Sequence, residues 1–281
     1  MKTLLLPWMF LASFQAQGAQ APPPAGSRVV KLTASDMLPI TAEVHSASED
    51  PRTPFLILLH DSHSSRGEYR EIVPRLRRMG FNTMSVDLRV GGKCKQVKNA
   101  TARAAGMLSS VKRADALRDI DAAVEYARAN EAHGKLLLWG SAYSASLAFV
   151  EAAKRPDLVD GVIAFAPGEY FAEEGPSATW IRDTAAEVAC PVFLASDQGS
   201  ESDWSPIFAS LPGEQKESFV PKQGGRHGSS SLWAEVKESE EYWKALAAFL
   251  DRYFPRTPAA SEPAGSEPAG SEKGSEEPRD G

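Results

Sequence analysis

Apolar residues along the chain fall into short runs that are bounded by glycine, proline and other turn-forming residues. Runs of this kind are typical of β-strands that are buried on both faces of a sheet. The first two runs lie close together and favour an antiparallel pair, whereas longer segments separate the others. We expect strands over residues 28–33, 40–45, 55–59, 82–86, 136–139, 161–165, 192–195 and 217–220.

The segments between these runs carry apolar residues at helical spacing. We expect helices over residues 69–79, 111–130, 143–154, 203–211 and 231–253. Strands that alternate with helices predict an α/β domain with an eight-stranded, mostly parallel sheet flanked by helices. The connection over residues 167–188 has room for one short helix, so we expect no large cap domain and an open pocket.

A sharp turn is indicated over residues 137–148, where an apolar strand passes through a glycine and small residues into a helix. This layout is typical of a nucleophile elbow, in which the central residue of G-x-S-x-G is the reacting serine. Anchoring the pattern on Gly140 puts Ala142 at the nucleophile position. Centring it on Ser141 would place bulky aromatic residues where the turn needs small ones, and centring it on Ser144 would start the turn well after the strand ends. We favour the Gly140 register and keep Ser144 and Ser141 as alternative nucleophiles.

A base and an acid follow the turn in the chain order of serine hydrolases. His227 lies in a glycine-flanked loop after the last expected strand, which is the place of the general base. The loop after the seventh strand holds three carboxylates. Counting along that loop favours Glu201 as the acid, with Asp203 and Asp197 as alternatives.

The loop after the third expected strand is the place of the first oxyanion donor. By position, the donors are the backbone amides of Ser62 and Tyr143. His60 and His63 are then ordinary loop histidines, because the donors are backbone groups. No cluster of cysteine, aspartate or glutamate completes a metal site with them, so we expect neither a metal nor another cofactor.

Taken together, these segments resemble the dienelactone-hydrolase-like α/β-hydrolases of the bacterial exported kind, over residues 33–253. The resemblance implies the α/β-hydrolase fold and chemistry of the serine carboxylesterase type. In such relatives the middle serine of a G-S-S-Y-S-like elbow corresponds to Ala142. The segments that carry the resemblance are residues 60–69, 87–92, 139–145, 165–170 and 227–230.

The first residues of the chain differ in composition from the middle. A lysine is followed by an apolar stretch over residues 4–12 that is too short to cross a bilayer, and small residues come next. This order predicts a cleavable signal peptide over residues 1–21 and a periplasmic or secreted protein, with no stable membrane insertion after cleavage.

The last residues, 257–281, repeat Ser-Glu-Pro-Ala-Gly and contain six acids and two bases, which is −4 of the formal net charge of −6. Such a composition predicts a disordered acidic tail. The middle, residues 26–255, is then one mildly acidic domain, which argues against a nucleic-acid partner. Cys94 and Cys190 lie on opposite edges of the expected sheet, so we expect no disulfide between them.

Loss of the nucleophile lowers the turnover rate by a factor of about 10⁶, because nucleophile, base and acid act as a unit. We therefore expect a pseudohydrolase that binds a small ester or carboxylic acid in the cleft. The alternative is an active serine ester hydrolase that uses Ser141 or Ser144 with His227 and Glu201.

Overall fold

The computed structural model describes residues 26–107, 110–174 and 176–256. The predicted signal peptide and acidic tail lie outside these residues. An eight-stranded sheet runs in the order β1-β2-β4-β3-β7-β8-β9-β10. β1 and β2 pair antiparallel, β2 pairs antiparallel with β4, and every later pairing is parallel. The predicted fold class, an α/β-hydrolase sheet, is confirmed.

The strands of this sheet are β1 (Ser27–Thr33), β2 (Pro39–His45), β3 (Phe55–Leu59), β4 (Asn82–Asp87), β7 (Leu136–Ser141), β8 (Gly161–Phe165), β9 (Val192–Ala195) and β10 (Lys216–Phe219). The α-helices are α1 (Val73–Arg78), α2 (Ala100–Ala105), α3 (Leu117–Asn130), α4 (Tyr143–Lys154), α5 (Trp180–Ala185), α6 (Glu201–Ser210) and α7 (Ser239–Tyr253). The remaining elements are short. Two strands form a small hairpin, β5 (Lys93–Cys94) and β6 (Val97–Lys98), and there are 3₁₀ turns η1 (Arg66–Tyr69), η2 (Arg113–Ala116) and η3 (Ser229–Leu232).

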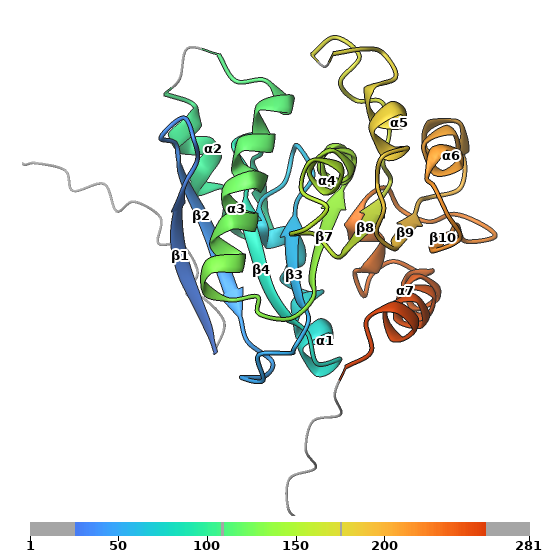
Figure 1. The fold of residues 1–281 in the computed structure, drawn as a ribbon, viewed down its shortest axis with the longest axis horizontal. Helices are drawn as coiled ribbons and strands as arrows, with labels where there is room; N and C mark the ends of the chain where they lie inside the picture. Colours follow the sequence, from blue (N-terminus) through green and yellow to red (C-terminus); the bar gives the residue numbers. More distant parts are fainter. Residues whose placement is uncertain (1–25, 108–109, 175, 257–281) are drawn as a thin grey trace, which may run out of the picture.

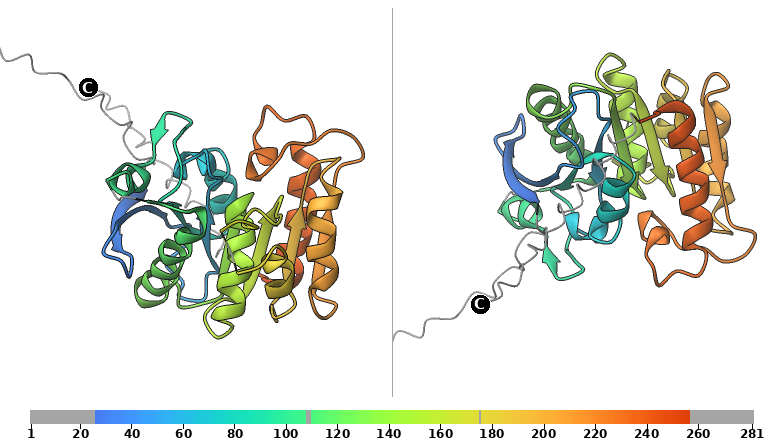
Figure 2. Two further views of the ribbon diagram at one scale, coloured as in Figure 1. Left: turned by 90° about the horizontal axis from the view of Figure 1, so that it is seen from above. Right: turned by 90° about the horizontal axis from the view of Figure 1, so that it is seen from below.

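Helices cover both faces of the sheet (Figures 1 and 2). On β3, Leu56 and Leu58 pack in the core beneath α1 and α7. The alternating residues Ile57 and Leu59 pack in the core beneath α3 and α4. Successive side chains of a strand point to opposite faces, so a strand covered on both sides must be apolar throughout. This explains the uninterrupted apolar runs.

The last helix begins later than the sequence predicts. Residues 229–232 form the turn η3, and the chain then becomes extended at Trp233, with φ −70° and ψ 146°. The Trp233 indole donates to the Glu68 carbonyl oxygen at 2.9 Å, and this contact holds the residue outside a helix. The short elements β5, β6 and α2 were not predicted. The short helix expected between β8 and β9 is α5.

Cys94 and Cys190 are free thiols, in agreement with the expected absence of a bridge. Within the described part of the chain, no helix has both the length and the apolarity needed to cross a membrane.

Candidate active site

Four loops meet at the carboxyl edge of the parallel strands, where α/β sheets usually hold their ligands. They follow β3, β7, β9 and β10 and carry Ser62, Ala142, Asp197 and His227 respectively. A cleft of about 180 Å³ lies between β5, η1 and the segments that follow β3, β7 and β10. Its lining includes Asp61, His63, Glu68, Lys93, Ser141 and His227.

The turn between β7 and α4 has the backbone of a nucleophile elbow. Ala142 adopts φ 52° and ψ −118°, a region that a residue with a Cβ rarely occupies. A Cβ on Gly140 would lie 2.3 Å from the Cα of Ala145, so the strand and the helix can approach only at a glycine. Neither Ser141 nor Ser144 has a positive φ. The geometry therefore fits the Gly140 register, with a methyl group at the centre of the turn.

The two serines beside Ala142 are buried and hydrogen-bonded. The Ser141 hydroxyl donates to Glu68 Oε1 at 2.6 Å and accepts the Ser229 amide at 2.8 Å. The Ser144 hydroxyl donates to the Leu59 carbonyl oxygen at 2.7 Å and accepts the Ser141 amide at 2.9 Å. Each hydroxyl thus holds the turn to a neighbouring segment.

His227 is brought to Asp197, which was the least favoured of the three candidate acids. His227 Nδ1 lies 3.4 Å from Asp197 Oδ1. Glu201 is the first residue of α6 and is exposed, and the exposed Asp203 carboxylate accepts from the Ser202 hydroxyl instead. The choice of Glu201 over Asp197 rested on counting along the loop. The early start of α6 places the two later carboxylates on the helix, whereas Asp197 stays beside the sheet edge.

The other ring nitrogen of His227 also has a partner. His227 Nε2, the atom that faces the nucleophile in a serine hydrolase, lies 3.2 Å from the Tyr170 hydroxyl. The Tyr170 hydroxyl is also 2.8 Å from the Ala166 carbonyl oxygen. The imidazole is therefore held between a carboxylate and a phenol.

His60 supports the oxyanion loop from inside the protein. Its Nδ1 donates to the Asp61 carbonyl oxygen at 2.7 Å, and its Nε2 accepts the Leu88 amide at 2.9 Å. Burial lowers the pKa of His60, which keeps the ring neutral with the proton on Nδ1. This agrees with the prediction of an ordinary loop histidine, and His63 lies exposed at the mouth of the cleft.

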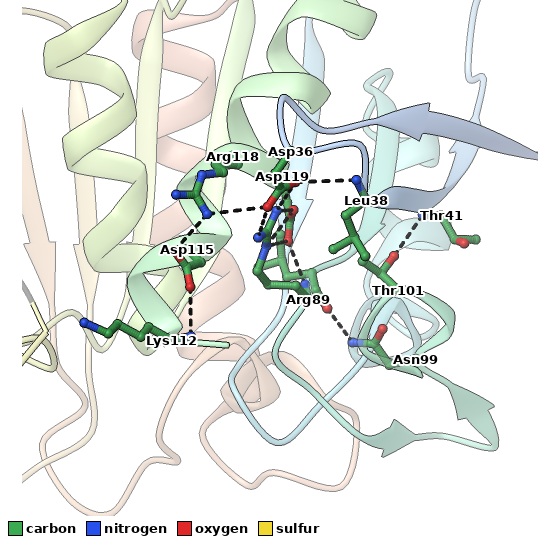
Figure 3. A network of polar contacts seen from close by, with 11 residues as sticks. Asp36, Leu38, Thr41, Arg89, Asn99, Thr101, Lys112, Asp115, Arg118 and Asp119 are labelled. Carbon is green, nitrogen blue, oxygen red and sulfur yellow. Dashed lines mark hydrogen bonds and ion pairs between the residues drawn. The ribbon is translucent and has the colours of Figure 1, made fainter. Parts of the chain in front are cut away.

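The chain at the end of β4, where the Leu88 amide donates to His60, is anchored by a buried ion pair of Arg89 (Figure 3). Arg89 donates to Asp119 of α3, with Nη2 2.7 Å from Oδ1, and to Asp36 of the β1–β2 turn, with Nη1 2.6 Å from Oδ2. Asn99 Nδ2 donates to the Leu88 carbonyl oxygen at 2.9 Å. These contacts fix the end of β4 against α3 and so fix the amide that His60 accepts.

Both expected oxyanion donors lie at the cleft edge of the sheet. The Tyr143 amide is the first of α4, where backbone donors have no partner within the helix. The Ser62 amide donates to the side chain of Asp61, with the nitrogen 2.5 Å from Oδ1. The two predicted donors therefore differ in their hydrogen bonding. The Ser62 amide already has an acceptor, whereas the Tyr143 amide has none within the helix.

One buried carboxyl group joins three of the loops. Glu68 Oε1 accepts from Ser141 of the elbow, and Oε2 accepts the Asp61 amide of the oxyanion loop at 2.9 Å. Ser141 in turn accepts the Ser229 amide, two residues after His227. Burial raises the pKa of Glu68 to about 7, although the Ser141 and Asp61 donors oppose the shift.

Three residues of the site were not assigned a role from the sequence: Asp61, Glu68 and Tyr170. All three lie in segments that carry the family resemblance, residues 60–69 and 165–170, but the sequence alone did not show that Asp61 and Glu68 line the cleft or that Tyr170 contacts His227. In the described residues, no group of histidine, cysteine, aspartate and glutamate side chains is arranged to hold a metal ion.

Comparison with known proteins agrees with this architecture. Residues 41–201, more than half of the chain, match the model of the dienelactone hydrolase family. Similar solved structures include a dienelactone hydrolase from Anabaena variabilis, with a TM-score of 0.63 at 15% identity over 81% of this chain and 97% of that one.

Two further similar structures are esterases. One is the Pyrococcus furiosus esterase Pf2001, with a TM-score of 0.61 at 16% identity over 81% of this chain and 92% of that one. The other is Est1E from Butyrivibrio proteoclasticus, with a TM-score of 0.59 at 14% identity over 81% and 99%. Identities this low show a shared fold alone, and no curated protein sequence matches the chain. On the family match, the chain belongs to the dienelactone hydrolase family.

Proposed function

We propose that this protein is an exported pseudohydrolase, which binds a small ester in the cleft of a hydrolase fold and does not cleave it. The observation that carries the proposal is Ala142. A methyl group stands at the strained centre of the elbow, while His227 and Asp197 remain paired beside it. Without the nucleophile, binding and the oxyanion donors supply only about 10³–10⁴ over the reaction in water.

The alternative, an active hydrolase that uses Ser141 or Ser144, is disfavoured by the contacts of both hydroxyls. Ser141 donates to Glu68 and Ser144 donates to Leu59, and His227 Nε2 is next to Tyr170 rather than to either serine. A nucleophile needs its base within hydrogen-bond reach.

The charges around the cleft favour an ester over a free acid as the ligand. Two carboxyl groups, those of Asp61 and Glu68, line it together with one lysine, Lys93. A carboxylate ligand would meet like charge, whereas a neutral ester would not. The proposed site of action is the periplasm or the medium, on the strength of the N-terminal sequence alone.

Covalent labelling with a fluorophosphonate probe tests the proposal. We expect no labelling of the unmodified chain and clear labelling of Ala142→Ser, with hydrolysis of p-nitrophenyl acetate rising by at least about 10³-fold in the variant. In that background, His227→Ala should abolish the gain. Labelling of the unmodified chain would refute the loss of activity.

Binding is tested with two isomers that differ in charge. Phenyl acetate should raise the melting temperature of the unmodified chain, and phenylacetate should not. Stabilisation by the acid instead of the ester would contradict the proposed ligand class.

A further inference from the structure

A strip of polar side chains lies on one face of the sheet, where a covered sheet face is normally apolar. Glu43 and His45 of β2 and Ser85 of β4 point to the face that η1 and α1 cover. The alternating residues Val44 and Met84 pack in the core on the other face. Glu43 and Ser85 are paired across the two strands, and all three polar side chains are buried. Their polar atoms therefore need partners away from bulk water.

The polar strip forms one wall of a cavity of about 40 Å³. A water molecule needs about 10–15 Å³ of such space, so the cavity has room for about three water molecules or one small ion. It is too small for an organic ligand, whose sites measure about 300–1,000 Å³. The other walls come from η1, α1 and the residues that join them: Arg66, Tyr69, Arg70, Val73, Pro74 and Arg77.

Two of the side chains that line the cavity carry a buried polar atom without a hydrogen-bond partner in the described residues. These atoms are the Ser85 hydroxyl and Arg70 Nε, and Ser85 is only 2% exposed. Most buried polar atoms in proteins are paired. A guanidinium group can only donate, and a hydroxyl is able to donate. An acceptor inside the cavity would therefore satisfy both atoms.

The two carboxylates beside the cavity already have partners. Glu43 Oε1 accepts from the Ser27 hydroxyl at 3.0 Å, and its Oε2 accepts from Arg66 Nε at 3.4 Å. Arg66 Nη1 also donates to Asp87 Oδ2 at 2.5 Å. One arginine is thus shared between two carboxylates.

The other two arginines that line the cavity have only neutral hydrogen-bond partners in the described residues. Arg70 Nη1 donates to the Lys95 carbonyl oxygen at 3.4 Å, and Arg77 Nε donates to the Ser46 carbonyl oxygen at 3.1 Å. Burial lowers the pKa of His45, which keeps that ring neutral. Three guanidinium groups therefore face two carboxylates, and a charge held away from water is stabilised by an opposite charge.

We propose that this cavity binds one small monovalent anion of the size of chloride, with the Arg70 guanidinium and the Ser85 hydroxyl as donors. A single negative charge balances the excess of one positive charge. The site is separate from the cleft, because Glu68 of η1 lines the cleft whereas Arg66 and Tyr69 of η1 line the cavity. The proposal does not depend on the proposed function. A bound anion ties η1 and α1 to β4.

The test measures the melting temperature of the full chain while sodium chloride replaces sodium gluconate at constant ionic strength. Gluconate is an organic anion and is too large for the cavity. An ion that binds only the folded state stabilises it, so we expect a saturable rise of at least about 3 °C in chloride. Amide hydrogen exchange over residues 66–77 should also become slower in chloride.

Three variants locate the effect. Arg70→Gln removes one charge of the lining and Ser85→Ala removes the hydroxyl, and each should reduce the rise in chloride by at least about half. Arg78→Gln is the matched control, because Arg78 is an exposed arginine of α1 outside the lining. This control should show the full rise.

The proposal is overturned if chloride and gluconate give the same melting temperature. A rise that stays linear in chloride and is equal in all variants also overturns it, because salt then acts on the whole surface. Crystals of the unmodified chain soaked in bromide decide the question if Arg70→Gln and Ser85→Ala fail to fold. An anomalous peak inside the cavity supports the proposal, and density without an anomalous peak there means that water alone fills the cavity and refutes it.

Discussion

Ala142 bears the backbone strain of a catalytic turn without carrying a reacting group. Its φ of 52° costs a residue with a Cβ about 1–3 kcal/mol, whereas glycine adopts such a conformation freely. Glycine also adds unfolded-state entropy, which costs up to about 1 kcal/mol. We therefore expect Ala142→Gly to leave the free energy of unfolding unchanged or to raise it.

The matched substitution is Ala145→Gly, three residues along in α4, where the backbone is helical. It should cost about 1 kcal/mol, because glycine is unfavourable within a helix. Urea melts of both variants compare the two effects. A loss at position 142 as large as that at position 145 would mean that the turn is not strained.

At the scale of elements, Glu68 holds the oxyanion loop to the elbow and, through Ser141, to the histidine loop. Glu68→Ala leaves the Ser141 hydroxyl and the Asp61 amide without their acceptor. Each buried unsatisfied group costs about 1–3 kcal/mol, so we expect the two together to lower the free energy of unfolding by about 2–6 kcal/mol. Glu68→Gln keeps one acceptor and the volume, and should cost less than half as much.

Urea unfolding at constant pH measures both Glu68 variants. The result that would contradict the joining role is an alanine variant as stable as the glutamine variant. Because Glu68 lies under the cleft, the same alanine substitution should also increase amide hydrogen exchange in the segments around Asp61 and Ser229.

At the scale of the whole molecule, buried carboxyl groups make stability depend on pH. Glu151 of α4 is fully buried, and neither of its side-chain oxygens has a hydrogen-bond partner in the described residues. Burial raises its pKa to about 7, and the Asp121 carboxylate of α3 adds to the shift while Lys154 and Arg155 oppose it. Burial likewise raises the pKa of Glu68 to about 7.

The folded state therefore retains protons that the unfolded chain has lost. For such groups, stability is greatest below the unfolded pKa of about 4.5 and falls as the pH rises toward about 7. Glu151 alone contributes a loss of up to about 3 kcal/mol, since one pKa unit is about 1.4 kcal/mol. We expect Glu151→Gln to lose less stability than the parent between about pH 5 and pH 8.

Urea melts at both pH values test this expectation, with the exposed Glu214→Gln as the control. An unchanged pH dependence in Glu151→Gln would show that Glu151 is ionised in the folded protein at pH 5 already. The pH dependence that remains in the variant should then diminish further when Glu68→Gln is added.

Local sequence patterns were sufficient to predict the architecture and the centre of the turn. Buried parallel strands need unbroken apolar runs, and the elbow needs small residues at fixed spacing, so both leave local patterns around Gly140 and Ala142. The place of His227 in the loop after the last strand was also predicted, and its role as the base stays a prediction. Strand ends agreed to within a few residues, but the start of α7 did not, because a contact between Trp233 and Glu68 ends the preceding turn.

Which side chains of the site contact one another depends on tertiary packing. Asp197 rather than Glu201 lies beside His227. Glu201 is the first residue of α6, whereas Asp197 stays in the loop at the edge of the sheet. Glu68 reaches the cleft, and Tyr170 reaches His227, from segments far from the elbow in the sequence. Distances between such segments depend on how the loops pack at the edge of the sheet, and no local pattern encodes them.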